Sequence, residues 1–373
     1  MERADLRFHN GTFTVMVIGD LHETVEDQDE QDLRKTRDAM ALLDAAAEAV
    51  KPDLAVYMGD MGKSEDEALM RKLIRRITLP LKKRDIPYAL VFGNHDRECD
   101  LPLQRQLELY REEYPNLYID DTPGLPGCGN CCVPVYGENG SRPVWRLWFA
   151  DSHGSYEDQS VSYYDWLRPE QVRWYRETAA ENAARDGKVL PALWFMHVPV
   201  REEYELLRKA KWYELPFSVH GFGKRKGGFY IRKDRSIGYL GEDPAAAEIN
   251  SGVFDAWKDV GDVRAAVFGH DHMNEFAGEV DGILLCQCKL TGFHPYTDGC
   301  NAGVRVFTLY ENEPGRFDTK MVHFKELGLK SESLGFVQRH FHDRQVIWAR
   351  IAAGAAGLAA LGAGAAVLIK KTK

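Results

Sequence analysis

Residues 265–276 read AAVFGHDHMNEF: an apolar run ends at Gly269, and two histidines separated by a single residue follow it. Continuous apolar runs of this length are typical of strands that are buried on both faces of a sheet. Five other apolar runs also end in polar residues: FTVMVIGD (13–20), LAVYMGD (54–60), YALVFGNHD (88–96), RLWFADSH (146–153) and ALWFMHV (192–198). The sequence therefore predicts an α/β fold whose buried strands end in short polar turns.

Helical patterns separate the first three of these runs, at residues 31–50 and about 64–84. A later pattern, with Pro169 near its start and Gly187 at its end, predicts another helix. Strands that alternate with helices form βαβ units with parallel pairing, and the carboxyl ends of parallel strands lie along one edge of a sheet. We therefore expect the polar residues after the runs to gather at a common rim.

The residue types expected at that rim are those that bind transition metals. They are Asp20, His22, Asp60, Asn94, His95, His197, His270 and His272. Imidazole nitrogens suit a transition metal, and a carboxylate can bridge two ions. Taken singly, each position has a structural explanation: an aspartate as a helix N-cap, the asparagine as a turn residue, His197 as a structural histidine. Their recurrence after five strands favours a site for two divalent cations.

The motifs GDLH, GD, GNHD, the histidine of MHVP and GHDH resemble, in this order, those of the calcineurin-like metallophosphoesterases. The resemblance covers roughly residues 12 to 310. FADSH (149–153), YYDWLRPEQVRWY (163–175), INSGVF (249–254) and TGFHPY (291–296) resemble the branch related to purple acid phosphatases. The resemblance implies a four-layer β-sandwich flanked by helices, with residues 1–345 as the catalytic domain.

The resemblance also implies a role for each residue at the rim. One metal is held by Asp20, His22 and His272, the other by Asn94, His197 and His270, and Asp60 bridges them. His95 either is the acid that protonates the leaving oxygen or stabilises the transition state, and Asp96 either orients His95 or caps a helix. In the purple enzymes a tyrosine that binds Fe(III) stands three residues after the bridging aspartate. Lys63 occupies that place here, which favours a colourless pair of Mn²⁺ or Fe²⁺, with Zn²⁺ as an alternative.

The reaction implied is hydrolysis of a phosphomonoester, by in-line attack of a hydroxide that bridges the two metals. The substrate would be a phosphorylated small molecule or a phosphoprotein. A phosphodiesterase or nucleotide pyrophosphatase with the same site is an alternative, and a membrane-tethered binding module with little catalysis is a rival of another class. Residues 120–145, an irregular Pro-, Gly- and Cys-rich stretch, and 203–250 are expected to be insertions that line the pocket. The basic cluster at 224–226 is either a set of solvated surface charges or a site that attracts an anionic substrate.

Composition limits the class of partner and the compartment. The formal net charge is −9, so the chain lacks the basic footprint of a nucleic-acid-binding protein. The N-terminus has no apolar stretch of the kind that a secretory signal needs, and the seven cysteines are expected to be reduced in the cytoplasm.

The C-terminal part of the sequence is different in character. After a polar connector at 311–345, residues 351–369 read IAAGAAGLAALGAGAAVLI, nineteen residues without a charge. As a helix they would extend about 28 Å, close to the thickness of a bilayer core. We expect residues 346–373 to form an apolar helix that anchors the protein on the cytoplasmic side of a membrane. An Ala-rich buried or surface helix is the alternative.

Overall fold

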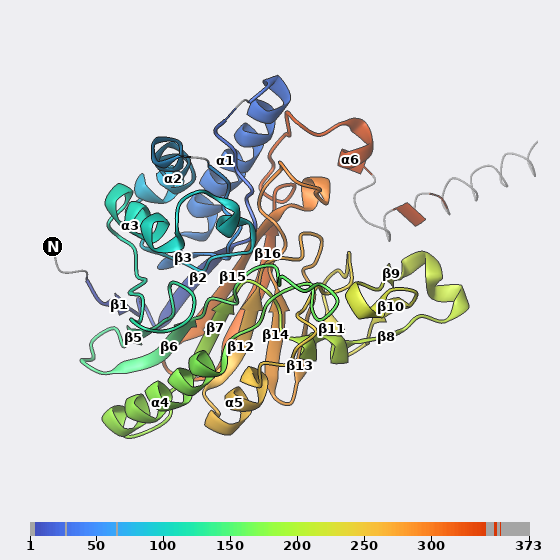
Figure 1. The fold of residues 1–373 in the computed structure, drawn as a ribbon. Coiled ribbons are helices and arrows are strands. Elements are labelled where there is room, and N and C mark those ends of the chain that lie inside the picture. The colour runs from blue at the N-terminus through green and yellow to red at the C-terminus, as the bar shows by residue number, and fades with distance from the viewer. Residues whose placement is uncertain (1–3, 27, 65, 341–346, 349–350, 352–373) are drawn as a thin grey trace, which may run out of the picture.

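Two large β-sheets face each other, and helices cover the outer side of each (Figure 1). The structure is a computed structural model, and it describes residues 4–26, 28–64, 66–340, 347–348 and 351. The chain thus has the mixed α/β architecture with several sheets that its sequence predicts.

The first sheet has five strands and carries the predicted βαβ units. Its order is β16 (Phe317–His323), β15 (Gly303–Tyr310), β2 (Thr12–Ile18), β3 (Leu54–Tyr57) and β4 (Tyr88–Leu90). The last three strands are parallel, as expected, and α1 (Glu30–Val50) and α2 (Glu67–Lys82) connect them. Each helix is preceded by an N-cap aspartate, Asp29 or Asp66. Its side chain accepts a hydrogen bond from a backbone N–H of the first turn.

The second sheet has eight strands, of which four consecutive neighbours are parallel: β6 (Pro143–Phe149), β7 (Ala192–Met196), β12 (Val263–Phe268) and β14 (Ile283–Gln287). Helices α4 (Pro169–Asp186) and α5 (Val253–Val260) lie on its outer side, whereas α1, α2 and α3 (Leu103–Glu113) lie beyond the other sheet (Figure 1). The order of strands is β1 (Leu6–Arg7), β5 (Cys131–Tyr136), β6 (Pro143–Phe149), β7 (Ala192–Met196), β12 (Val263–Phe268), β14 (Ile283–Gln287), β13 (Ala277–Val280) and β11 (Ser236–Ile237).

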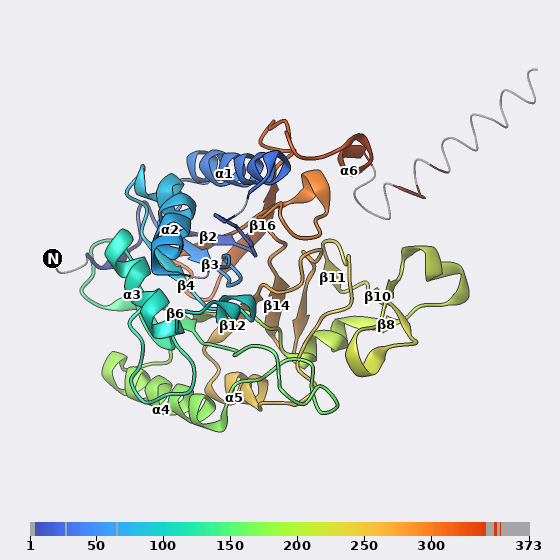
Figure 2. The ribbon, with the colours of Figure 1, turned by 45° about the horizontal axis from the view of Figure 1, so that its top comes forward.

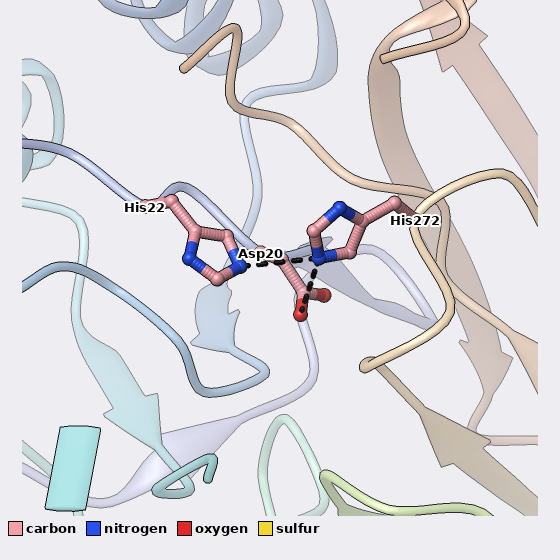
Figure 3. Close-up of side chains that lie close together, drawn as sticks. All are labelled: Asp20, His22 and His272. Atoms are coloured by element: carbon pink, nitrogen blue, oxygen red, sulfur yellow. Dashed lines mark hydrogen bonds and ion pairs between the residues drawn. The ribbon is translucent and has the colours of Figure 1, made fainter. Parts of the chain in front are cut away.

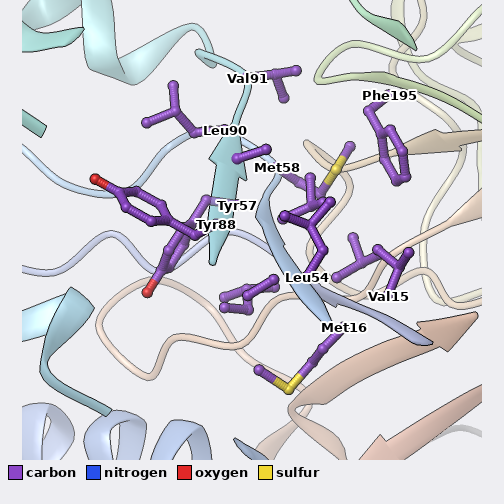
Figure 4. Close-up of a cluster of buried hydrophobic side chains, with 14 of the residues drawn as sticks. Val15, Met16, Leu54, Tyr57, Met58, Tyr88, Leu90, Val91 and Phe195 are labelled. Carbon is purple, nitrogen blue, oxygen red and sulfur yellow. The ribbon is translucent and has the colours of Figure 1, made fainter. Parts of the chain in front are cut away.

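The core has two main parts, which follow from this layering. Side chains from both sheets meet in one cluster. It contains Val15 and Leu54 from the five-stranded sheet and Phe195 from the eight-stranded sheet (Figure 4). A second cluster, rich in tryptophan, fills the space between the eight-stranded sheet and α4 and α5. There the buried Asp262 accepts hydrogen bonds from Trp148 Nε1 and Tyr175 Oη, which fixes α4 to the sheet.

The prediction of a rim on a single sheet was wrong, because the strands that carry the candidate residues belong to both sheets. β2, β3 and β4 lie in the five-stranded sheet, and β7 and β12 in the eight-stranded sheet. The apolar runs could not distinguish the two sheets, since a strand inside either one is buried on both faces.

Two stretches predicted to be irregular contain strands. Residues 131–136 form β5, which pairs antiparallel with β6, so that 120–145 is not simply an irregular excursion. Residues 317–323 form β16, which pairs with β15 along its whole length, so that 311–345 is more than a connector. Residues 203–250 include a small separate sheet of β8 (Leu207–Lys209), β10 (Phe229–Arg232) and β9 (Val219–His220).

The predicted apolar helix at 351–369 lies outside the described residues, apart from Ile351. Within the ranges that are described, none of the helices has both the length and the apolar character that a membrane span requires.

Candidate metal centre

All eight candidate residues lie close together, in the loops that follow five strands. They form three overlapping clusters in which the ligand atoms lie within 4.8 Å of one another: Asp20, His22 and His272; His22, Asp60 and His95; and Asp60, His197 and His270. Asn94 joins the last cluster through its side-chain oxygen, 3.2 Å from His197 Nε2. The structure therefore brings together every residue that the sequence predicted for the site.

The first cluster combines two imidazoles with a carboxylate (Figure 3). The Nε2 atoms of His22 and His272 are 3.1 Å apart, and His272 Nε2 is 3.8 Å from Asp20 Oδ1. The Asp20 carboxylate also accepts the backbone N–H of His270, at 3.1 and 3.2 Å. Two imidazole nitrogens and one oxygen thus point at a common volume, which is how ligands of one cation are arranged.

The third cluster contains a histidine, His197, whose tautomer follows from its surroundings. His197 is fully buried, and its Nδ1 donates a hydrogen bond to the Met58 carbonyl at 2.6 Å. Its Nε2 lies 3.2 Å from Asp60 Oδ2 and 3.2 Å from Asn94 Oδ1. A hydrogen bond from one ring nitrogen to a backbone carbonyl is the usual way in which a metal-binding histidine is held with its other nitrogen free.

The backbone is strained at three of these residues. His22, Asp60 and His270 have φ angles of 44°, 50° and 72°, a region that residues other than glycine rarely adopt. Such strain persists where surrounding contacts enforce it, and it concentrates at functional sites. Gly59 precedes Asp60 with φ +93°, and a Cβ there would lie 2.6 Å from both the Gly93 nitrogen and His197 Nδ1. The glycine of the GD motif therefore allows the two sheets to approach.

Asp96 has a different role from either of the two expected. Its buried carboxylate accepts the backbone N–H groups of Asp60, Met61 and Gly93, at 2.8, 3.1 and 2.8 Å. Asp96 therefore ties the loop after β3 to the loop after β4, and the expectation that it orients His95 or caps a helix was wrong. The short 3₁₀ helix η1 (His95–Glu98) begins after Asn94, so Asp96 lies inside it.

The sequence analysis missed Glu98, whose carboxylate lies against the ring of His95. His95 Nδ1 lies 2.8 Å from Glu98 Oε1, and its backbone N–H donates to Asp60 Oδ1 at 2.8 Å. Glu98 also pairs with Lys63, the residue that stands in the place of the purple enzymes' tyrosine. His95 is about two-fifths exposed, unlike the buried donors beside it, so a substrate can reach it.

The pKa shifts of the site indicate that its buried carboxylates need a positive charge beside them. Burial lowers the pKa of His22 to about 4 and of His272 to about 3, so both imidazoles are neutral at pH 7 and keep a lone pair for a metal. Burial raises the pKa of Asp20 to about 7. Burial also opposes ionisation of Asp60 and of His197, but their mutual attraction outweighs it, lowering the pKa of Asp60 and raising that of His197 to about 10. A buried proton on His197 thus balances carboxylates that a metal cation would balance.

The donor atoms fit two divalent cations. Among the residues with described positions, His270 Nε2 is buried and has no hydrogen-bond partner, although buried polar nitrogens are normally bonded. Nitrogen donors from four histidines, with two carboxylates and one amide, suit transition metals and not magnesium or calcium.

Aromatic side chains that the sequence analysis did not assign form the walls of the site. Tyr164 meets His270 edge-on at a centroid distance of 4.2 Å, and Tyr296 stacks on His272 at 4.3 Å. Phe222, from the 203–250 insertion, packs against Tyr164 at 5.9 Å. That insertion therefore reaches the site through an aromatic residue. Its basic cluster is engaged in other contacts, since Arg225 pairs with Asp243 and Lys226 donates to the Tyr163 hydroxyl.

Comparisons with known proteins agree with this geometry. The model of the family described as Calcineurin-like phosphoesterase matches residues 13–274. The chain is 31% identical over 325 residues to "Probable inactive purple acid phosphatase 28" of Arabidopsis thaliana, covering 78% of this chain and 73% of that protein. It is 28% identical over 326 residues to "Probable inactive purple acid phosphatase 29" of the same plant, covering 79% and 76%. A solved dimetal phosphatase from Danio rerio has the same fold, with a TM-score of 0.51, 12% identity, and 84% and 99% of the two chains covered.

Replacing Asp60 with asparagine should abolish most of the stabilisation that a divalent cation gives. A ligand that binds only the folded state raises the melting temperature, by roughly 3–5 °C at about 100 times its dissociation constant. Thermal unfolding with and without Mn²⁺ measures this shift. Asp60→Asn should lose it, whereas Asp234→Asn, at an exposed position away from the site, should keep it. A full shift in Asp60→Asn would show that the cation binds elsewhere.

Proposed function

We propose that the chain, which belongs to the calcineurin-like phosphoesterase family, is a metal-dependent phosphatase that hydrolyses a phosphomonoester of a small molecule or a protein. The observation that carries this proposal is the convergence of a full set of seven donors, with His95 beside them. Family membership supports phosphoester chemistry in general. The choice of a monoester rests on the likeness of the FADSH and TGFHPY motifs to the purple acid phosphatase branch.

Two of the relatives have "inactive" in their names, so activity in this chain is argued from its own residues. A binding module that has lost catalysis has no need to keep strained ligand positions and a half-exposed histidine beside them. This chain keeps positive φ angles at His22, Asp60 and His270, and His95 is held on Glu98. These features support an enzyme.

The residues divide into two ligand sets that share one member. Asp20, His22 and His272 would hold one cation, and Asn94, His197 and His270 the other, with Asp60 between them. Mn²⁺ or Fe²⁺ suits these donors, and Zn²⁺ is the alternative. When bound, such a pair lowers the pKa of water and neutralises charge on a phosphoryl group.

The chain's own contribution to the reaction comes from His95 and its neighbours. Glu98 occupies Nδ1 of His95, which leaves Nε2 as the nitrogen that can hold a proton for the leaving oxygen. Lys63 pairs with the carboxylate of Glu98 in turn, so that Glu98 is held in place beside the ring. The aromatic walls formed by Tyr164 and Tyr296 limit the access of water to the donors.

For the location of the protein, we propose that residues 351–369 anchor it on the cytoplasmic side of a membrane. Their lack of charge and their length support this placement. Fractionation of cells that express the chain with and without residues 346–373 tests it. The full chain should sediment with membranes and the shorter one should not; a wholly soluble full chain would contradict the anchor.

The proposed activity predicts how the purified chain behaves toward two chromogenic substrates. With Mn²⁺ present, it should hydrolyse a phosphomonoester faster than the corresponding phosphodiester. Chelation should abolish both reactions, and added Mn²⁺ should restore them. Faster cleavage of the diester would identify a phosphodiesterase with the same centre, and no cleavage of either would reject an enzyme acting on such esters.

His95→Ala should lower kcat by about 10² to 10⁴ and leave the Mn²⁺ thermal shift intact, because His95 supplies a proton and not a ligand. The pH profile gives a further readout. Burial lowers the pKa of His95 below its ordinary value of 6.5. Since the protonated form is the acid, kcat/KM should fall as pH rises through that lowered pKa, and the variant should lack this limb. An unchanged kcat, or a limb retained in His95→Ala, would assign the acid to another group.

A further inference from the structure

The insertion after β7 forms a projecting basic lobe, residues 207–235, built on the small sheet of β8, β10 and β9 (Figure 2). It contains nine Lys or Arg and two Asp or Glu, a formal charge of +7 in a chain whose net charge is −9. Among the described residues of the lobe, Arg208 pairs with Glu214 and Arg225 with Asp243. The other basic side chains keep the lobe strongly positive, whereas the rest of the chain is acidic.

The same lobe exposes large apolar side chains to an unusual degree. Trp212 is 82% exposed and Phe217 51% exposed. Tyr213, Leu215 and Phe229 are exposed as well, so that the lobe carries a third of the large exposed apolar residues among those described. Lys211 lies over the ring of Tyr213 at 5.7 Å, which shows basic and aromatic groups mixed on one surface. Exposed apolar groups gathered in this way mark an interaction surface.

The lobe lies next to the start of the C-terminal apolar sequence. Trp348 donates from Nε1 to the Pro216 carbonyl at 2.9 Å, and its ring lies 6.3 Å from that of Phe217. The uncharged stretch begins three residues later, at Ile351, which is no more than about 11 Å of extended chain. Tryptophan, tyrosine and lysine or arginine beside an apolar segment are the residues that lie at the headgroup level of a bilayer.

We propose that the basic lobe is a docking surface for an anionic lipid bilayer, on which Trp212 and its apolar neighbours enter the headgroup region and the surrounding lysines and arginines bind acidic headgroups. Positive charge favours a negatively charged leaflet, and each basic residue near it adds to the attraction. The lobe protrudes from the two large sheets (Figure 2), and its apolar side chains are exposed, which suits contact with an extended surface. This contact is additional to the apolar segment and differs from it in requiring anionic lipid.

Flotation of the full chain with vesicles separates the two contacts. Vesicles of phosphatidylcholine alone measure binding that does not depend on lipid charge, and vesicles with about 30% phosphatidylserine measure the part due to the lobe. Wild type should bind the anionic vesicles at least tenfold more tightly, and 0.5 M salt should remove most of that gain.

The variants Lys209→Glu/Lys211→Glu and Trp212→Ser should each lose most of the gain on anionic vesicles. Lys188→Glu/Lys320→Glu, which reverses two exposed charges elsewhere, should keep it. All three should hydrolyse a small soluble phosphate ester at the wild-type rate, so a failure here is distinct from a failure of the proposed function. Equal binding to both vesicle types, or equal losses in lobe and control variants, would overturn the proposal. So would a lobe variant that loses binding to heparin but not to the anionic vesicles, since the partner would then be an acidic macromolecule.

Discussion

The contact between Asp60 and His197 joins the two sheets, and the rest of the site depends on it. Asp60 follows β3 of the five-stranded sheet and His197 follows β7 of the other, with 3.2 Å between their side chains. His197 also donates to the Met58 carbonyl, and the His270 N–H donates to Asp20, so that each bond links a strand end of one sheet to a strand end of the other. Much of the space between the sheets is filled by apolar side chains, whose contacts are not directional. The polar bonds therefore fix where the two sheets stand relative to each other at the edge that carries the donors.

Much of the fold follows from local pattern, and what does not follow has identifiable causes. The six strands with continuous apolar runs and the helices between them could be predicted, because burial on both faces leaves a clear signal. β5 escaped prediction because it follows a Gly-rich stretch and contains Pro134, a residue that a central strand rarely holds. It is tolerated there because its outer neighbour, β1, is only two residues long and pairs at Val135 and Tyr136. β16 was not predicted because its charged residues alternate with the others and face solvent, so that it lacks a continuous apolar run.

The donors of the site could be predicted because each directly follows a strand, whereas the groups that position them could not. Glu98 contacts His95 because η1 is a 3₁₀ helix, in which side chains three residues apart lie over each other. A sequence read as a loop gives no reason to expect that. Lys63 and Asp96 act across loops of different strands, and no spacing along the chain encodes such contacts. Lys63, which the sequence analysis considered only as the absence of a tyrosine, thus belongs to the surroundings of His95 through Glu98.

The candidate metal ligands and the aromatic side chains around them are held by different parts of the chain. Strand ends inside two packed sheets fix the donors, as close contacts at Gly59 and Gly93 require. The walls come from loops: Tyr164 lies between His270 and Phe222, and Phe222 belongs to the basic lobe. A change at Phe222 would therefore act on His270 through Tyr164. The donors are thus held by strand ends of both sheets, whereas the aromatic residues around them depend on loops and on the insertion.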